Sequence, residues 1–405
     1  MKRVLALAMI ALLAVPASAG LGTSTASFSG GPTDDTDGVA IAAQTNGTVV
    51  NGSNVTRTRL ELSGDTRHNV TRPSLDLGAA IAADDGALES AYQTRVDQRR
   101  IFSASDGDRL VERFTDRVET RIDALRTRER AATQAYAAGD ISEQELARRL
   151  VLIANEANQL HDQLKALGDV ANRRETTLRI TSLEFRPRSF TGRAHDELER
   201  GLRGTKTSHV SITATQNGYV LGLLNQSEGT YYRQALRFDN RNPDGPTTLK
   251  TTDQAFDRLR ALYPETKTDE VFIPSLQRAR DAGLYEVSIN YPEGSSTLYL
   301  DAATSSVFFE VKRLDVEAMP RSTVLNRTID GLRIVVERTY DNGPALVKAF
   351  DADTGEPAGV TLAVDGRDVG GTGVNGERWF IAPSGTYQLS VSNGDARFNV
   401  TVPAA

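Results

Sequence analysis

Two matched apolar seams joined by a very short connection constrain the fold of this chain more than any other feature. In the second seam, apolar residues recur at alternating steps of four and three: Leu146, Leu150, Ile153, Ala157, Leu160, Leu164, Leu167 and Ala171. Such an a/d pattern predicts an amphipathic helix whose stripe packs against another helix. Ser142 and Glu145 mark its start, because their spacing is that of a capping box.

The upstream seam repeats at intervals of seven through Val111, Val118, Leu125 and Ala132. Only residues 138–141 separate the two patterns, so both helices must run antiparallel and bury their seams on each other. We therefore predict an antiparallel, coiled-coil α-helical hairpin over 87–175. Two helices leave part of each seam exposed, so either a third helix over about 87–102 covers it or the hairpin self-associates.

The first residues have the pattern of a secretory signal peptide. Basic Lys2 and Arg3 precede an apolar run over 4–15, and small residues follow in an A-x-A arrangement. The run is shorter than the roughly 20 residues that a membrane span needs. We predict a Sec-type signal over 1–19 with cleavage after Ala19, which would make the mature chain secreted or cell-surface, without a transmembrane span.

Residues 20–86 are rich in Thr, Ser, Gly, Asp and Asn and poor in aromatic residues, which predicts a flexible arm. Export makes the N-x-[ST] triplets candidate glycosylation sites, because a glycosyl transferase would meet them. The seven candidates are Asn46, Asn51, Asn54, Asn69, Asn225, Asn326 and Asn399.

Composition excludes several classes of function. The 405 residues carry 47 basic and 53 acidic side chains, so the net charge of −6 has the wrong sign for a nucleic-acid or anionic-membrane partner. No cysteine is present, which excludes disulfides, thiol catalysis, Fe–S clusters and cysteine-ligated zinc. Only seven basic residues are lysine, and this arginine excess with a mild acidic balance resembles haloarchaeal proteins.

Residues 176–250 and 251–318 switch to the period of strands and predict two α+β units. Each unit holds a helix, a hairpin and a third strand, an internal repeat that predicts symmetry. In the first unit we expect a strand with imperfect alternation over 177–185, a helix over 194–202, a hairpin over 208–224 and a third strand over 229–239. In the second we expect the equivalent elements over 254–262, 284–291, 296–301 and 307–314.

The second unit resembles the PepSY domain. Its strand over 284–291 runs LYEVSINY, and Tyr299 to Val307 run YLDAATSSV where the family pattern is YVDARTGEV. Ser305 replaces the turn glycine of that pattern. The resemblance implies a non-catalytic α+β module found on secreted peptidase precursors and envelope proteins, thought to regulate peptidases. The alternative is an ordinary α+β hairpin unit with a similar turn.

Residues 319–405 show short, regularly spaced strands with turn signals and no helical pattern, which predicts a β-sandwich. Its turn motifs Asp353-Thr354-Gly355-Glu356-Pro357 and Pro383-Ser384-Gly385-Thr386-Tyr387 resemble those of carboxypeptidase regulatory-like, transthyretin-like sandwiches. That resemblance implies adhesion, spacing or accessory binding, and no chemistry.

No catalytic constellation emerges. Among the four histidines, only His195 has a neighbour at metal-ligand spacing, Glu199 at i+4, and no third ligand accompanies them. We predict no catalytic residue, metal ligand or cofactor. The expected fold is multi-domain α+β, and the expected function is that of a non-enzymatic surface protein acting through contacts with envelope proteins. The alternative is a PepSY-like regulator or inhibitor of an exported peptidase.

Overall fold

The computed structural model describes residues 57–172, 180–205, 209–279, 283–394 and 396–404. The predicted signal peptide, most of the predicted arm, and Asn46, Asn51 and Asn54 lie outside these ranges. The described chain is α+β and multi-domain, with helices, one large sheet and a C-terminal β-sandwich, as the sequence predicted.

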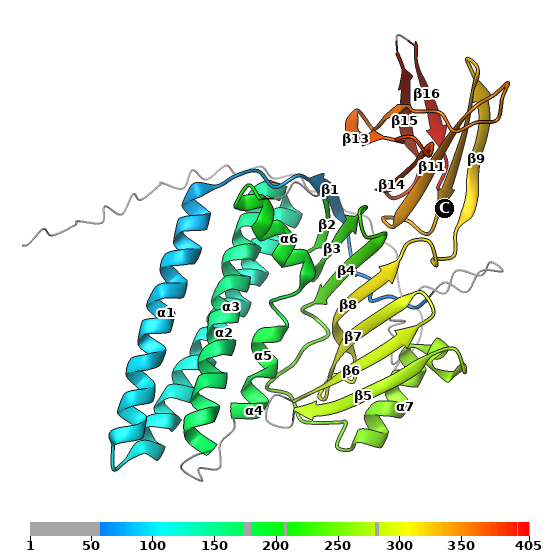
Figure 1. Ribbon diagram of the computed structural model, residues 1–405. Coiled ribbons are helices and arrows are strands. Elements are labelled where there is room, and N and C mark those ends of the chain that lie inside the picture. The colour runs from blue at the N-terminus through cyan, green and yellow to red at the C-terminus, as the bar shows by residue number, and fades with distance from the viewer. Residues whose placement is uncertain (1–56, 173–179, 206–208, 280–282, 395, 405) are drawn as a thin grey trace, which may run out of the picture. The chain divides into compact units, whose positions relative to one another are not determined.

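Three long helices pack side by side: α1 (Leu77–Ser103), α2 (Gly107–Ala138) and α3 (Glu143–Asn172) (Figure 1). Most described heptad residues of α2 and α3, from Val111 to Leu125 and from Ile153 to Leu167, lie in one buried cluster with Ile101 of α1, whereas Ala132, Leu146 and Leu150 lie in the cluster with the sheet. Gly139 ends α2 with φ 92°, a left-handed conformation that glycine adopts at low cost. A third helix therefore covers the α2–α3 hairpin.

The expected boundary of the flexible arm at residue 86 is wrong. From Arg57 onward the chain belongs to the fold: β1 (Arg67–Thr71) pairs with β2 (Val210–Thr215), and α1 begins at Leu77. Asp76 caps α1 by accepting a hydrogen bond from the Ala79 amide at 2.9 Å. The polar composition of this stretch did not predict β1, because the strand with which it pairs lies far along the chain.

The two α+β units are one domain, so the expected boundary at 250/251 is wrong. Their strands form a single antiparallel sheet in the order β1-β2-β3-β4-β8-β7-β6-β5. The further strands are β3 (Gly218–Asn225), β4 (Thr230–Arg237), β5 (Phe272–Ala279), β6 (Leu284–Tyr291), β7 (Gly294–Asp301) and β8 (Val307–Asp315). The third strands, β4 and β8, pair with each other at the centre, because each would otherwise leave an unpaired edge.

Different elements cover the two faces of this sheet. On one face, α2, α3 and α6 (Arg193–Leu202) pack on residues such as Tyr219 and Leu221. The short helices α4 (Ile180–Leu183) and α5 (Phe185–Arg188) precede α6, so the strand expected over 177–185 is wrong for its described residues. On the other face lie α7 (Thr252–Leu262), the 3-10 helix η1 (Pro264–Lys267) and Leu60. The extended segment that carries Leu60 is the basis of the candidate site.

The C-terminal sandwich has two four-stranded sheets, ordered β14-β11-β10-β9 and β13-β12-β15-β16. Its strands are β9 (Ser322–Ile329), β10 (Leu332–Arg338), β11 (Pro344–Asp351), β12 (Thr361–Val364), β13 (Arg367–Gly371), β14 (Glu377–Ile381), β15 (Tyr387–Asn393) and β16 (Ala396–Val402). One apolar cluster fills the space between the sheets. Within the described ranges, no helix has the length and apolarity that a membrane crossing requires.

Glu129 places a carboxyl group in the interface between α2 and the sheet. This residue is 3% exposed, and Tyr219 on β3 donates a hydrogen bond to its Oε1 at 2.8 Å. Burial raises the pKa of Glu129 to about 8, although Tyr219 and Arg126 oppose the shift. The folded protein therefore holds a proton here that the unfolded chain releases near pH 4.5.

The pKa of Glu129 is higher in the folded state than in the unfolded state. The stabilisation that its proton gives the fold is therefore complete below pH 4.5 and is lost as pH rises to about 8. We predict that the free energy of unfolding falls across this window by up to about 1.4 kcal/mol per pH unit, and that Glu129→Gln removes this slope. Denaturant titrations at several pH values measure it. Glu112→Gln, on the exposed part of α2, serves as control, and equal slopes in both variants would contradict the assignment.

Candidate functional site

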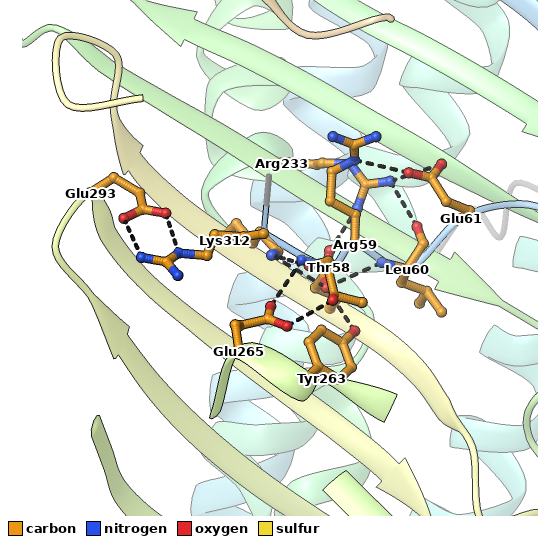
Figure 2. Close-up of polar contacts among 11 residues, drawn as sticks. Thr58, Arg59, Leu60, Glu61, Arg233, Tyr263, Glu265, Glu293 and Lys312 are labelled. Carbon is orange, nitrogen blue, oxygen red and sulfur yellow. Dashed lines mark hydrogen bonds and ion pairs between the residues drawn. The ribbon is translucent and has the colours of Figure 1, made fainter. Parts of the chain in front are cut away.

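An extended segment of the chain crosses the sheet face opposite α2 and α3. We call residues 57–63 the strap (Figure 2). The strap forms no strand, yet its main chain is tied to the central strands β4 and β8 and to residues after α7. These partners lie between 173 and 254 residues further along the sequence. The strap is thus a long-range element of the domain.

Cationic side chains of the central strands donate to the strap's carbonyl groups. Lys312 on β8 donates to the Thr58 carbonyl at 2.6 Å, and Arg233 on β4 donates to the Leu60 carbonyl at 2.7 Å. Arg237, also on β4, donates to the Glu61 carbonyl at 3.3 Å. All three cationic residues are buried, so these bonds form where water competes little.

Carboxylates accept from the strap's amides. The Thr58 amide donates to Glu265 Oε1 at 2.9 Å, and the Leu60 amide donates to Glu310 Oε2 at 3.2 Å. Main-chain donors and acceptors of the same two strap residues are therefore each met by a charged side chain. Charge-assisted bonds of this kind are stronger than bonds between neutral groups.

Strap side chains are held as specifically as its backbone. Arg57 forks onto Glu293, in the turn between β6 and β7, at 2.6 and 3.3 Å. The Thr58 hydroxyl donates to Glu265 Oε2 at 2.7 Å. Leu60 is 1% exposed and lies in the apolar cluster that contains Leu259 of α7. The strap therefore presents an arginine, a hydroxyl and a leucine to three distinct positions.

The charges that hold the strap also pair with one another. Arg233 donates to Glu310 Oε1 at 2.6 Å, and Tyr263 donates to Glu310 Oε2 at 2.8 Å. Glu310 is 0% exposed and Lys312, 3.8 Å away, is 1% exposed at the side chain. Burial lowers the pKa of Lys312, while Glu310 opposes that shift. Burial also acts to lower the pKa of Arg233, but Glu61 and Glu310 outweigh it and raise that pKa.

Sequence reasoning missed this cluster, although one signal was present. In the apolar strand β8, Glu310 and Lys312 stand two residues apart, so both point to the same face. Charged side chains inside a strand that is otherwise buried need partners on that face. The identity of the partners could not be predicted, because the strap lies in a segment that composition assigned to the flexible arm.

The pair His195 and Glu199 does not form a ligand set. His195 is buried and its Nδ1 lies 3.0 Å from Gln234 Nε2, whereas Glu199 accepts from Arg203 on the same helix. Across the part of the chain that the structure describes, no group of three or more His, Cys, Asp or Glu side chains could hold a metal ion. His68 and His209 line a separate cleft of about 600 Å³.

Four candidate glycosylation sites lie on described strands. Asn69 is half-buried on β1 and its Oδ1 accepts from the Val70 amide, and Asn225 is only 6% exposed at the end of β3. Asn326 on β9 and Asn399 on β16 are exposed. The two sandwich sites are therefore the accessible ones of these four.

Family models match three consecutive parts of the chain. A model described as a domain of unknown function, DUF7096, matches residues 1–206, which is more than half of the chain. The chain belongs to the DUF7096 family. A model described as a family of unknown function, DUF7094, matches residues 210–320, and an archaeal fibronectin-III type-like domain matches 323–400. No curated protein and no solved structure matches the chain significantly.

These matches make the chain an archaeal multi-domain protein with a C-terminal β-sandwich. The sandwich match is to the fibronectin-III type, whereas its turn motifs resembled the carboxypeptidase regulatory-like type; both are small antiparallel sandwiches. The 210–320 match spans most of both predicted α+β units, in agreement with their shared sheet. The strap lies within the first family match, and most residues that hold it lie within the second.

The buried charges predict that substitution of two glutamates near the strap has very different effects on the unfolding free energy. Glu310→Gln leaves Arg233 and Lys312 buried without their shared carboxylate, so we expect a loss of roughly 3–5 kcal/mol in unfolding free energy. Glu61→Gln removes a carboxylate that is 39% exposed and should cost less than about 1 kcal/mol. Chemical denaturation measures both. Similar losses in the two variants would contradict the assigned role of Glu310.

Proposed function

We propose that this protein is exported and acts without catalysis, as a multi-module protein that binds other proteins at the cell surface or outside the cell. The observation that carries this proposal is the strap: the sheet binds an extended segment of polypeptide through buried side chains that recognise its main chain. A surface with this chemistry suits protein contacts.

Two further features support the proposal. The C-terminal domain is of a fibronectin-III-like type, a sandwich architecture common among cell-surface proteins. The basic, apolar and small-residue sequence of 1–20 has the order of a secretory signal. The excess of arginine over lysine favours a haloarchaeal source, where an acidic, cysteine-free surface protein is in keeping with the composition.

Export predicts a defined mature N-terminus. Protein recovered from the medium or the cell surface should begin at Gly20, because the A-x-A arrangement ends at Ala19. Peptide mass analysis of the isolated protein measures this directly. Ala17→Asp, which removes one small residue of the cleavage motif, should leave the leader attached. A wild-type protein that retains Met1 and stays inside the cell would contradict export.

A specific observation also favours the second candidate, a PepSY-like regulator of an exported peptidase. Ser305 has φ 56°, so it keeps the left-handed turn at the position where the PepSY pattern has glycine. Asp301, which matches the aspartate of that pattern, accepts from the amides of Ala303 and Thr304 at 2.8 Å. Purified full-length chain added to an exported peptidase separates the candidates: regulation requires a changed rate of cleavage, and an unchanged rate favours the first.

A further inference from the structure

The strap has the features of a bound peptide. Its residues are extended but join no ladder, and the five main-chain hydrogen bonds described above all run to side chains. A strand of the domain would pair with neighbouring backbone, as β1 does with β2. Recognition of one backbone by side chains of another element is the arrangement that a peptide receptor needs.

Stability alone does not account for the charges that make these contacts. Replacing buried ion pairs by packed apolar residues is often neutral or stabilising, so a strap needed only for folding could rest on apolar side chains. Here Arg233 and Lys312 supply donors, and Glu265 and Glu310 supply acceptors, to the main-chain groups of Thr58 and Leu60. This set recognises an extended backbone whatever chain supplies it.

The same site also binds particular side chains of the strap. Glu293 holds the guanidinium of Arg57 through two bonds, Glu265 accepts the Thr58 hydroxyl, and the apolar cluster encloses Leu60. A fitting segment therefore carries arginine, then a hydroxyl residue, then arginine, whose guanidinium lies 3.7 Å from the ring centroid of Tyr340, then leucine. Bidentate arginine recognition and a buried leucine together give sequence selectivity.

The junction between the strap and β1 allows the strap to leave without unpairing β1. Gly64, Asp65 and Thr66 are exposed, and Gly64 has φ 92°. A Cβ placed on Gly64 would meet no atom within 4 Å, so the junction is not packed against the domain. Three exposed residues therefore separate the strap from the first ladder pair, Arg67 with Ala214.

We propose that the strap site, formed by Arg233, Arg237, Glu265, Glu293, Glu310, Lys312 and the apolar cluster around Leu60, binds an extended segment of a partner protein. The segment has the pattern Arg-[Thr/Ser]-Arg-Leu, and the strap occupies the site in cis as its competitor. This inference rests on the proposed role in protein binding and names the site and the chemistry of its ligand.

The test uses the full chain and a fluorescent synthetic peptide with the sequence of residues 57–63. The variant Arg57→Glu/Leu60→Asp weakens the strap's own hold, because the introduced glutamate would face Glu293 and the introduced aspartate would lie close to Glu310. We expect this variant to bind the peptide at least tenfold more tightly than the wild-type chain. Arg95→Glu/Leu88→Asp makes the same charge change at exposed positions of α1 and should behave as wild type.

Exchanging the charges at positions 57 and 293 tests whether peptide binding depends on this one contact. Glu293→Arg combined with Leu60→Asp alone keeps Arg57 in the strap, so the strap stays repelled; this variant should bind the Arg57 peptide at least tenfold more weakly than the strap variant does and should bind a peptide with glutamate at that position. A peptide with aspartate in place of Leu60 should bind neither variant. All these measurements use purified protein. Absence of peptide binding would therefore contradict the strap site as a receptor and would not bear on the prediction of export.

Three results would overturn the proposal. The first is a strap variant that unfolds cooperatively, as wild type does, yet does not bind the peptide. The second is peptide binding that ignores the exchange at Glu293. The third is a stable dimer of the wild-type chain in light scattering that the strap variant does not form, because the occupant is then a second copy and not a partner.

If the strap variant fails to fold, the wild-type strap with a protease site inserted at Gly64-Asp65 decides the question. After cleavage, exchange of the native strap for labelled peptide, with cooperative unfolding retained, supports the proposal. Loss of the folded state when the cut strap is released overturns it, because the strap is then part of the core.

Discussion

The pairing of Arg233 with Glu310 at the centre of the sheet is the interaction on which the rest of this domain depends. Arg233 belongs to the third strand of the first α+β unit, and Glu310 to the third strand of the second. Each also bonds to the main chain of Leu60 in the strap. One buried ion pair thus joins three segments that lie far apart in the sequence, and removal of either charged side chain would leave its buried partner without this contact.

Local patterns predicted the elements whose partners are close in sequence. Ile153 to Leu167 pack in one cluster with α2 because four connecting residues hold the two helices antiparallel, and the hairpins β2–β3 and β6–β7 form between strands that were expected. The start of α1 at Leu77 was missed, since Gly78 and Gly86 weaken the helical signal. Strand β5 was missed because it contains Pro274, which a strand at the edge of a sheet tolerates.

Features that depend on distant partners could not be predicted in the same way. The shared sheet requires β4 to meet β8, and the strap requires Thr58 to meet Lys312, 254 residues away. Composition described 57–66 as arm because it has few apolar residues. Buried charged side chains form the hydrogen bonds that the main chain of this polar segment needs, and Leu60 lies in an apolar cluster. The alternation of Glu310 and Lys312 was one trace of this arrangement in the sequence.

The central claim is that the strap is held as a ligand of the domain and not as part of its cooperative core. Hydrogen exchange of the Thr58 and Leu60 amides, compared with amides of β4 and β8, tests this most directly. We predict that the strap amides exchange through local opening, with protection well below that of the central strands. Equal protection at both places, with both following global unfolding in denaturant, would contradict it.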